Sequence, residues 1–377
     1  MRIIDRYLLR QFVQVFLICF SSLTGLYIVF DAFGNLDEFL RFAEKEGNLL
    51  GTMFQYYTLR SIYFFDRTSG VLALIAAMFT VTWIQRYNEL TALLAAGLPT
   101  RRVMKPVFVA AIAISLLAAA NREIIIPRFS HQLGRDSKDL AGDVGRDLQP
   151  RPDHETSILF RGRHTFAKEQ RIAEPNLLLR NQLSDFGRQI SADNAFYRPA
   201  NADHPGGYLL QGVRDPVDIA ERSSAMLGDR QVIITPKDAP WLKPNECFVA
   251  SNMTFDQLTG GSQWRQFSST WQLVRGLRNP SLDFGADVRV SIHGRIVQPL
   301  LDVTLLFLGL PLVLTRENRN MFVAIGLCMV AVSMFMMIVL ASQYIGNVSL
   351  VSPAFAAWLP LFIFVPVAVN LCEPLRV

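Results

Sequence analysis

The longest stretch of this sequence without Asp, Glu, Lys or Arg covers 53 positions, between Arg319 and Glu373. A helix that crosses a bilayer needs about 20 apolar residues, so this stretch has room for two such helices and a turn. Residues 346–353 include Gly, Asn, Ser and Pro, which favour turns, and they lie near the middle of the stretch. The pattern therefore predicts two membrane spans, at 321–345 and 353–372.

Four further stretches with few or no charges predict spans at 11–31, 66–85, 104–121 and 296–315. The third is short, but Lys105 at its edge can extend toward lipid headgroups. The fourth contains a single charged residue, Asp302. Only 18% of the chain is charged, against about 25% in typical soluble domains. We expect a polytopic α-helical membrane protein with six transmembrane helices.

Basic residues in short loops indicate the cytoplasmic side of a membrane. One side of the predicted arrangement carries ten Lys and Arg residues, in 1–10, 86–105, 316–319 and 373–377. The other side carries four, all in 31–67. Both termini are therefore predicted to be cytoplasmic, and the long insert between the third and fourth spans is predicted to lie on the opposite side.

This insert, residues 122–294, is richer in charged residues, Gly and Pro than the spans. Short runs typical of strands recur in it, at 157–160, 207–210, 231–234 and 287–292. We expect a β-sandwich or β-jelly-roll-like domain, with the chain divided into residues 1–121, 122–294 and 295–377. The insert contains one cysteine, Cys247, so it cannot form an internal disulfide.

Common catalytic and metal-binding motifs are absent from the sequence. There is no Gly-x-x-x-x-Gly-Lys-Ser/Thr nucleotide loop, no His-Glu-x-x-His and no Cys-x-x-Cys. The five histidines are scattered. We therefore predict no catalytic residue, no metal site and no cofactor on this chain. The net charge of +5 is spread over several loops, so no nucleic-acid partner is expected.

The segment from about 86 to 98, between the second and third spans, predicts a short amphipathic helix. Glu89 to Ala96 favour a helix, and Gly97 followed by Pro99 ends it. Such a helix suits either of two roles. It can lie in the membrane interface, or it can dock into a groove on a cytoplasmic partner.

This segment resembles the coupling segment of the lipopolysaccharide-export permeases, the LptF/LptG (YjgP/YjgQ) family. The matching positions are Glu89, Leu90, Thr91, Leu93, Ala95 and Gly97. Further similarities occur in the same order along the chain, at Asp5–Leu8, Asn121–Pro127, Ile190–Tyr197, Pro299, Leu310-Pro311 and Trp358–Pro360. The resemblance thus extends over the whole chain, including the large insert.

The resemblance implies a non-enzymatic permease subunit of an ABC-type exporter in the bacterial inner membrane. The implied partners are a cytoplasmic ABC ATPase dimer that binds ATP and Mg, a second permease subunit, a periplasmic jelly-roll bridge protein, and lipopolysaccharide or a related lipid. Which of the two permease roles the chain takes stays open, as does its pairing with itself or a relative. Three alternatives also remain: a permease for another envelope lipid or glycolipid, a membrane-anchored sensor or assembly factor, and, least favoured, an intramembrane enzyme.

Two sets of candidate site residues follow. The ATPase-coupling set is Arg86, Glu89, Leu90, Leu93, Leu94 and Gly97. The substrate-path set is Phe30, Asp31, Phe33, Arg41, Lys45 and Asp302.

Each candidate has a plainer alternative. Glu89 can simply stabilise a helix N-terminus, and Asp302 can be wetted from outside or paired with another helix. Family exporters often carry a basic residue near the outer end of the first span. Here Ile28, Asp31 and Asn35 occupy that region, so the basic residue is absent or displaced to Arg41.

Overall fold

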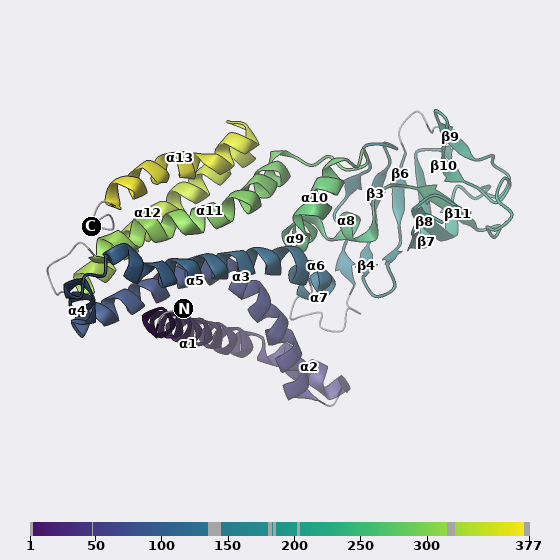
Figure 1. Ribbon diagram of the computed structural model, residues 1–377. Helices are drawn as coiled ribbons and strands as arrows, with labels where there is room; N and C mark the ends of the chain where they lie inside the picture. Colours follow the sequence, from purple (N-terminus) through teal and green to yellow (C-terminus); the bar gives the residue numbers. More distant parts are fainter. Residues whose placement is uncertain are drawn as a thin grey trace. The chain divides into compact units, whose positions relative to one another are not determined.

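The computed structural model describes residues 3–46, 48–134, 145–179, 183, 186–201, 204–314 and 321–372. The chain divides into two compact units (Figure 1). The helical unit consists of Met1–Asp37, Asn48–Phe129 and Gly285–Val377, and the β unit consists of Glu38–Gly47 and Ser130–Phe284. The boundaries expected from the sequence were residues 121 and 295. The helical unit instead continues to Phe129 and resumes at Gly285.

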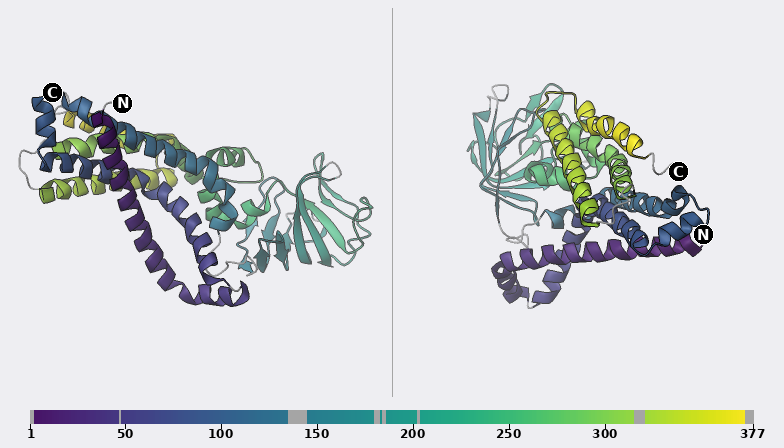
Figure 2. Two further views of the ribbon diagram at one scale, coloured as in Figure 1. Left: turned by 60° about the horizontal axis from the view of Figure 1, so that its bottom comes forward. Right: turned by 90° about the vertical axis from the view of Figure 1, so that its left-hand side faces the viewer.

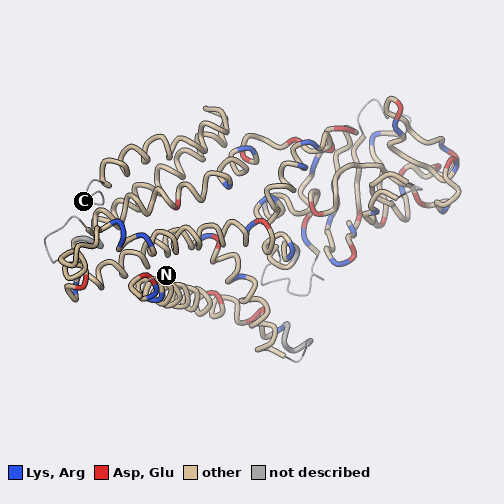
Figure 3. The backbone as a smooth tube through the Cα atoms, in the orientation of Figure 1, with Lys and Arg blue, Asp and Glu red and all other residues tan. Residues whose placement is uncertain are grey.

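Six helices among the described residues are long and apolar enough to cross a membrane. The first two are α1 (Ile3–Gly34) and α3 (Leu49–Arg86), and the third is α5 (Thr100–Ala120), continued by the π-helix η1 (Asn121–Ile125) and α6 (Ile126–Arg128). The last three are α11 (Ala286–Leu314), α12 (Met321–Asn347) and α13 (Pro353–Leu371). Each predicted span coincides with one of these helices. Long stretches of these helices carry no charged residue (Figure 3).

The core of the helical unit is apolar and is shared by helices far apart in sequence. Phe12 of α1, Leu74 of α3, Val107 of α5 and Val297 of α11 are fully buried in one cluster. Large apolar side chains also cover the outside of several of these helices, above all α1 and α12. Such surfaces are suited to contact lipid tails or other membrane helices.

Two sequence expectations need correction here. The alternation at 287–292 predicted a strand, but these residues form the first turns of α11. Six alternating residues do not distinguish the two periods, and the apolar sequence continues into a span that only a helix can form. The predicted outer loop at 31–67 is also largely helical, because it contains α2 (Leu36–Glu46) and the first turns of α3.

The β unit contains eleven described strands joined in one antiparallel sheet. The main path runs β1-β4-β5-β7-β8-β11-β10-β9, and β2-β3-β6 branches from β7. The strands are β1 (Arg146–Asp147), β2 (Arg151–Pro152), β3 (Leu159–Arg161), β4 (His164–Phe166), β5 (Arg171–Ala173), β6 (Asn176–Leu178), β7 (Gln189–Arg198), β8 (Gly207–Asp215), β9 (Ala225–Leu227), β10 (Arg230–Ile234) and β11 (Glu246–Ala250). The predicted β domain is confirmed, while its classification as a jelly roll stays a prediction.

Four short helices accompany the sheet: α7 (Ser130–Leu133), α8 (Phe255–Thr259), α9 (Gly261–Phe267) and α10 (Thr270–Leu277). The first residues of α8 and α10 are fixed by capping boxes, Thr254 with Gln257 and Ser269 with Gln272. Tyr208 of β8 is fully buried, and its hydroxyl donates to the Met253 carbonyl at 3.2 Å. Burial also raises the pKa of the Cys247 thiol to about 12, so this free cysteine stays protonated at neutral pH.

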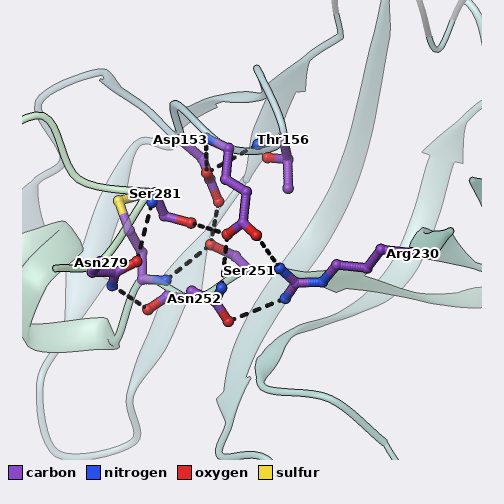
Figure 4. Close-up of polar contacts among 9 residues, drawn as sticks. Asp153, Thr156, Arg230, Ser251, Asn252, Asn279 and Ser281 are labelled. Atoms are coloured by element: carbon purple, nitrogen blue, oxygen red, sulfur yellow. Dashed lines mark hydrogen bonds and ion pairs between the residues drawn. The ribbon is translucent and has the colours of Figure 1, made fainter. Parts of the chain in front are cut away.

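A buried polar network holds the loop after β2 against the loop after β11 (Figure 4). The Asp153 carboxylate accepts from the backbone N–H groups of Glu155 and Thr156, at 3.0 and 3.2 Å, and from the Ser251 hydroxyl at 2.6 Å. The neighbouring Glu155 carboxylate pairs with Arg230 at 2.6 Å. Both oxygens of the buried Asp153 carboxylate therefore accept hydrogen bonds, one from its own loop and the other from the loop after β11.

Replacing Asp153 by Ala is expected to destabilise the β unit by about 2–4 kcal/mol, because it leaves several donors without their acceptor in the protein interior. Hydrogen exchange of the β8 and β11 amides in the full-length protein measures this loss. Asp229→Ala, in the exposed turn between β9 and β10, is the matched control and is expected to leave exchange unchanged. Equal exchange in the two variants would contradict the expectation.

Candidate functional site

The predicted coupling segment forms α4 (Glu89–Ala95), a short helix between α3 and α5. Its end is a Schellman motif, in which Leu98 N–H donates to the Leu93 carbonyl at 3.1 Å and Gly97 N–H donates to the Leu94 carbonyl at 2.9 Å. Gly97 has φ +79°, a conformation that glycine adopts without strain. The sequence signal Gly97-x-Pro99 therefore ends α4 and turns the chain into α5. The start of α1 and the end of α13 lie at this end of the helical unit (Figure 2), which we call the α4 end.

The six predicted coupling residues take different positions on α4 and its flanks. Leu90 is buried and Leu93 is half-buried, and both pack on the apolar core of the helical unit. Leu94 is 42% exposed, and Arg86 at the end of α3 is also exposed. Leu90 and Leu93 thus anchor the helix, while Leu94, Arg86 and the half-buried Glu89 remain available to a partner.

Two polar pairs at the α4 end were not anticipated from the sequence. The Tyr7 hydroxyl of α1 donates to the Glu89 carboxylate, at 3.1 Å to Oε2 and 3.3 Å to Oε1. Asp5, also in α1, forms an ion pair with Arg102 in the first turn of α5 at 3.0 Å. The first helix is thus bonded to α4 itself and to the start of α5.

The opposite end of α1 carries three of the predicted substrate-path residues. Phe30 and Phe33 are 71% and 78% exposed. The Asp31 carboxylate lies between them in sequence and accepts a hydrogen bond from the Tyr57 hydroxyl of α3 at 3.0 Å. This end therefore presents two aromatic side chains, while Asp31 joins α1 to α3.

The other predicted substrate-path residues lie elsewhere. Arg41 is exposed on α2, in a part of that helix that belongs to the β unit, and Lys45 lies on the same helix. Asp302 is buried in α11, with 9% of its surface exposed. The structure thus places the six residues in three groups rather than in one site.

Asp302 lies in a polar cluster among three helices. Its carboxylate accepts from the Ser115 hydroxyl of α5 at 2.6 Å and from the Gln298 amide one turn earlier in α11 at 2.9 Å. Gly70 of α3 lies directly against it, and a Cβ atom at that position would be 2.5 Å from Oδ1. The Asp302 carboxylate thus joins α11 to α5, and its place in a substrate path stays a prediction.

The same cluster continues toward the end of α5, where the helix changes to π-helical geometry. Asn121 opens the π-helix, and its side-chain amide donates to the Ile62 carbonyl of α3 at 2.9 Å. The next residue, Arg122, pairs with Asp66 of α3 at 2.9 Å. A cavity of about 30 Å³ lies among these groups, Asp66, Arg122, Ser115 and Asp302 included, which is room for a water molecule. Isolated π-helical turns often occur at functional sites.

A family model described as "Lipopolysaccharide export system permease LptF/LptG" matches residues 6–373. The chain belongs to the LptF/LptG permease family. Comparison with curated proteins gave no match. The LptF/LptG permeases are membrane components of lipopolysaccharide export rather than enzymes, and the six apolar helices agree with a multi-pass inner-membrane protein.

The segments that resembled this family in the sequence occupy defined positions in the fold. Glu89 is the first residue of α4, Asn121 opens the π-helix, and Ile190–Tyr197 lies in β7. Among the described residues of this LptF/LptG permease, no group of three or more His, Cys, Asp or Glu side chains is arranged to hold a metal ion. The polar groups that the structure brings together are suited to binding a partner and to joining helices.

Proposed function

We propose that this LptF/LptG permease is the membrane subunit of an ABC-type exporter that extracts lipopolysaccharide from the inner membrane. ATP hydrolysis on a cytoplasmic ATPase dimer, which binds ATP and Mg, drives the export. The lipid passes to a periplasmic bridge of β-jelly-roll domains. A second permease of the family completes the membrane part, and no cofactor is held by this chain.

The observation that carries this proposal is α4 in a member of the LptF/LptG family. Its buried leucines fix the helix on the spans, and Leu94 and Glu89 remain at the surface of the α4 end. A short helix that presents an exposed leucine and a partly exposed carboxylate is suited to a groove with a basic residue. Basic residues are in excess in the segments that the sequence places on the side of the coupling segment. This excess favours a cytoplasmic location for α4, and with it a periplasmic location for the β unit.

Affinity purification of the full-length chain in mild detergent tests the proposal. We expect an ABC ATPase and a second LptF/LptG permease to co-purify, and ATP hydrolysis by that ATPase to rise when the permeases are reconstituted with it. Recovery of the chain without an ATPase, or an ATPase rate independent of the permeases, would contradict the exporter and favour the membrane-anchored sensor.

One observation supports another envelope lipid or glycolipid as the cargo. The outer end of α1 carries Asp31, bonded to Tyr57, in the region where family exporters often have a basic residue. A carboxylate there attracts lipid phosphates less than a base would. The identity of the lipid therefore needs a direct measurement.

A further inference from the structure

The α4 end of α1 is packed into the same core as the coupling segment. Leu8 and Phe12 of α1 are fully or almost fully buried, and they belong to one apolar cluster with Leu90 of α4 and Val103 of α5. A displacement of α4 is therefore expected to displace α1 through the packed side chains, because close-packed interiors transmit strain.

Two polar pairs join α1 to this region in addition to the apolar packing. Tyr7 donates to Glu89 at the start of α4, and Asp5 pairs with Arg102 at the start of α5. Glu89 lies within the coupling segment and Arg102 lies just after it, so the two pairs bond α1 to α4 and to α5. Neither pair joins sequence neighbours, since 82 and 97 positions separate the partners.

The pair with Tyr7 also affects how Glu89 meets a partner. A carboxylate has about four acceptor positions, so one hydroxyl shared between the two Glu89 oxygens leaves others for a cation from the ATPase. The bond holds the Glu89 carboxylate in one orientation. Tyr7 is thereby placed to position Glu89 and to move with it.

The far end of the same helix is bonded as well. Asp31, 24 residues after Tyr7, accepts from Tyr57 of α3, and the two positions are about 36 Å apart along a helix. Between them α1 is one uninterrupted helix. A displacement at Tyr7 therefore reaches the end that carries Phe30 and Phe33.

We propose that Tyr7 and Asp5 are positioning residues that transmit the movement of α4 to α1. The first span then moves together with α4 when the ATPase hydrolyses ATP. This inference rests on the proposed function, since it presupposes that an ATPase moves α4. It assigns a role to side chains that touch neither ATP nor lipid. Their loss is expected to separate ATP hydrolysis from lipid movement.

The test uses the complete permease–ATPase complex in nanodiscs that contain lipopolysaccharide, with the soluble bridge protein as acceptor. Lipid delivered and ATP hydrolysed are measured together. In the double variant Tyr7→Phe/Asp5→Asn, we expect the lipid delivered per ATP to fall about fivefold, because two polar bonds are lost. Tyr344→Phe, which removes an exposed tyrosine hydroxyl of α12 outside the coupling segment, is the control and is expected to keep the wild-type ratio.

A ratio within about twofold of wild type in the double variant would overturn the inference while leaving the proposed function intact. A wild-type complex that delivers no lipid would instead contradict the proposed function. If the double variant does not assemble, the charge exchange Asp5→Arg/Arg102→Asp decides. The inference predicts that the exchange recovers at least half of the ratio lost in Asp5→Arg alone, and no recovery would overturn it.

Discussion

Replacing Glu89 by Lys is expected to reduce recovery of the ATPase with the purified permease by about 30-fold or more. The change reverses the charge on the first residue of α4 and removes the acceptor of the Tyr7 hydroxyl. If a basic groove on the ATPase receives this helix, as we propose, the substitution places like charges in contact, which costs about 2–5 kcal/mol at an interface. Co-purification from membranes, quantified against the amount of permease, measures the effect.

Two control variants make this result specific. Glu221→Lys applies the same charge reversal at an exposed position of the β unit and is expected to leave recovery unchanged. Glu89→Gln keeps a hydrogen-bond acceptor for Tyr7 and is expected to give an intermediate loss. Full recovery of the ATPase with Glu89→Lys would show that the carboxylate acts only at the helix N-terminus.

The second large effect is expected at Gly70, where α3 meets Asp302. A Cβ atom at this position would lie 2.5 Å from Oδ1 and 2.9 Å from Cγ of Asp302. The carboxyl group would have to move, and it cannot do so without weakening its bonds to Ser115 and Gln298. Gly70→Ala is therefore expected to lower the stability of the helical unit by about 2–4 kcal/mol.

Heating the purified protein in detergent and measuring the fraction that remains in solution tests this expectation. The matched control is Gly25→Ala in α1, where no atom lies within 4 Å of the added Cβ, and little change is expected. Adding Asp302→Ala to Gly70→Ala removes the steric conflict, so the pair should be less than additive. Equal stability of the two single glycine variants would contradict the role given to this contact.

The membrane spans could be predicted from the sequence because they follow from one physical requirement. Charges are excluded from the bilayer interior, so the gaps between them outline the spans. The same reasoning placed the start of α3 too late, because Arg60 and Asp66 interrupt its N-terminal half. The charge-free run before Arg60, residues 47–59, is too short to cross a bilayer. The strand predicted at 287–292 failed for a related reason, since a short alternation does not show where a long helix begins.

The candidate sites were predicted only where one segment contained the whole signal. Glu89 and Gly97 belong to a single motif, and α4 forms where that motif lies. Tyr7 was missed because its pairing with Glu89 depends on which helices become neighbours. Ser115 and Gln298 were missed because uncharged polar residues in a span carry no distinctive pattern, and the only signal was that Asp302 needed a partner.

The most direct test of the central proposal is to identify the lipid that meets the outer end of α1. A photo-crosslinking phenylalanine analogue at Phe30, which is 71% exposed, would be activated in membranes and the adduct identified by mass spectrometry. The same analogue at Val369 of α13 serves as the control for general contact with membrane lipid. We predict a lipopolysaccharide adduct at position 30 that depends on ATP hydrolysis and is weak at position 369. A different lipid at position 30, or equal labelling at both positions, would contradict the assignment of this chain to lipopolysaccharide export through α1.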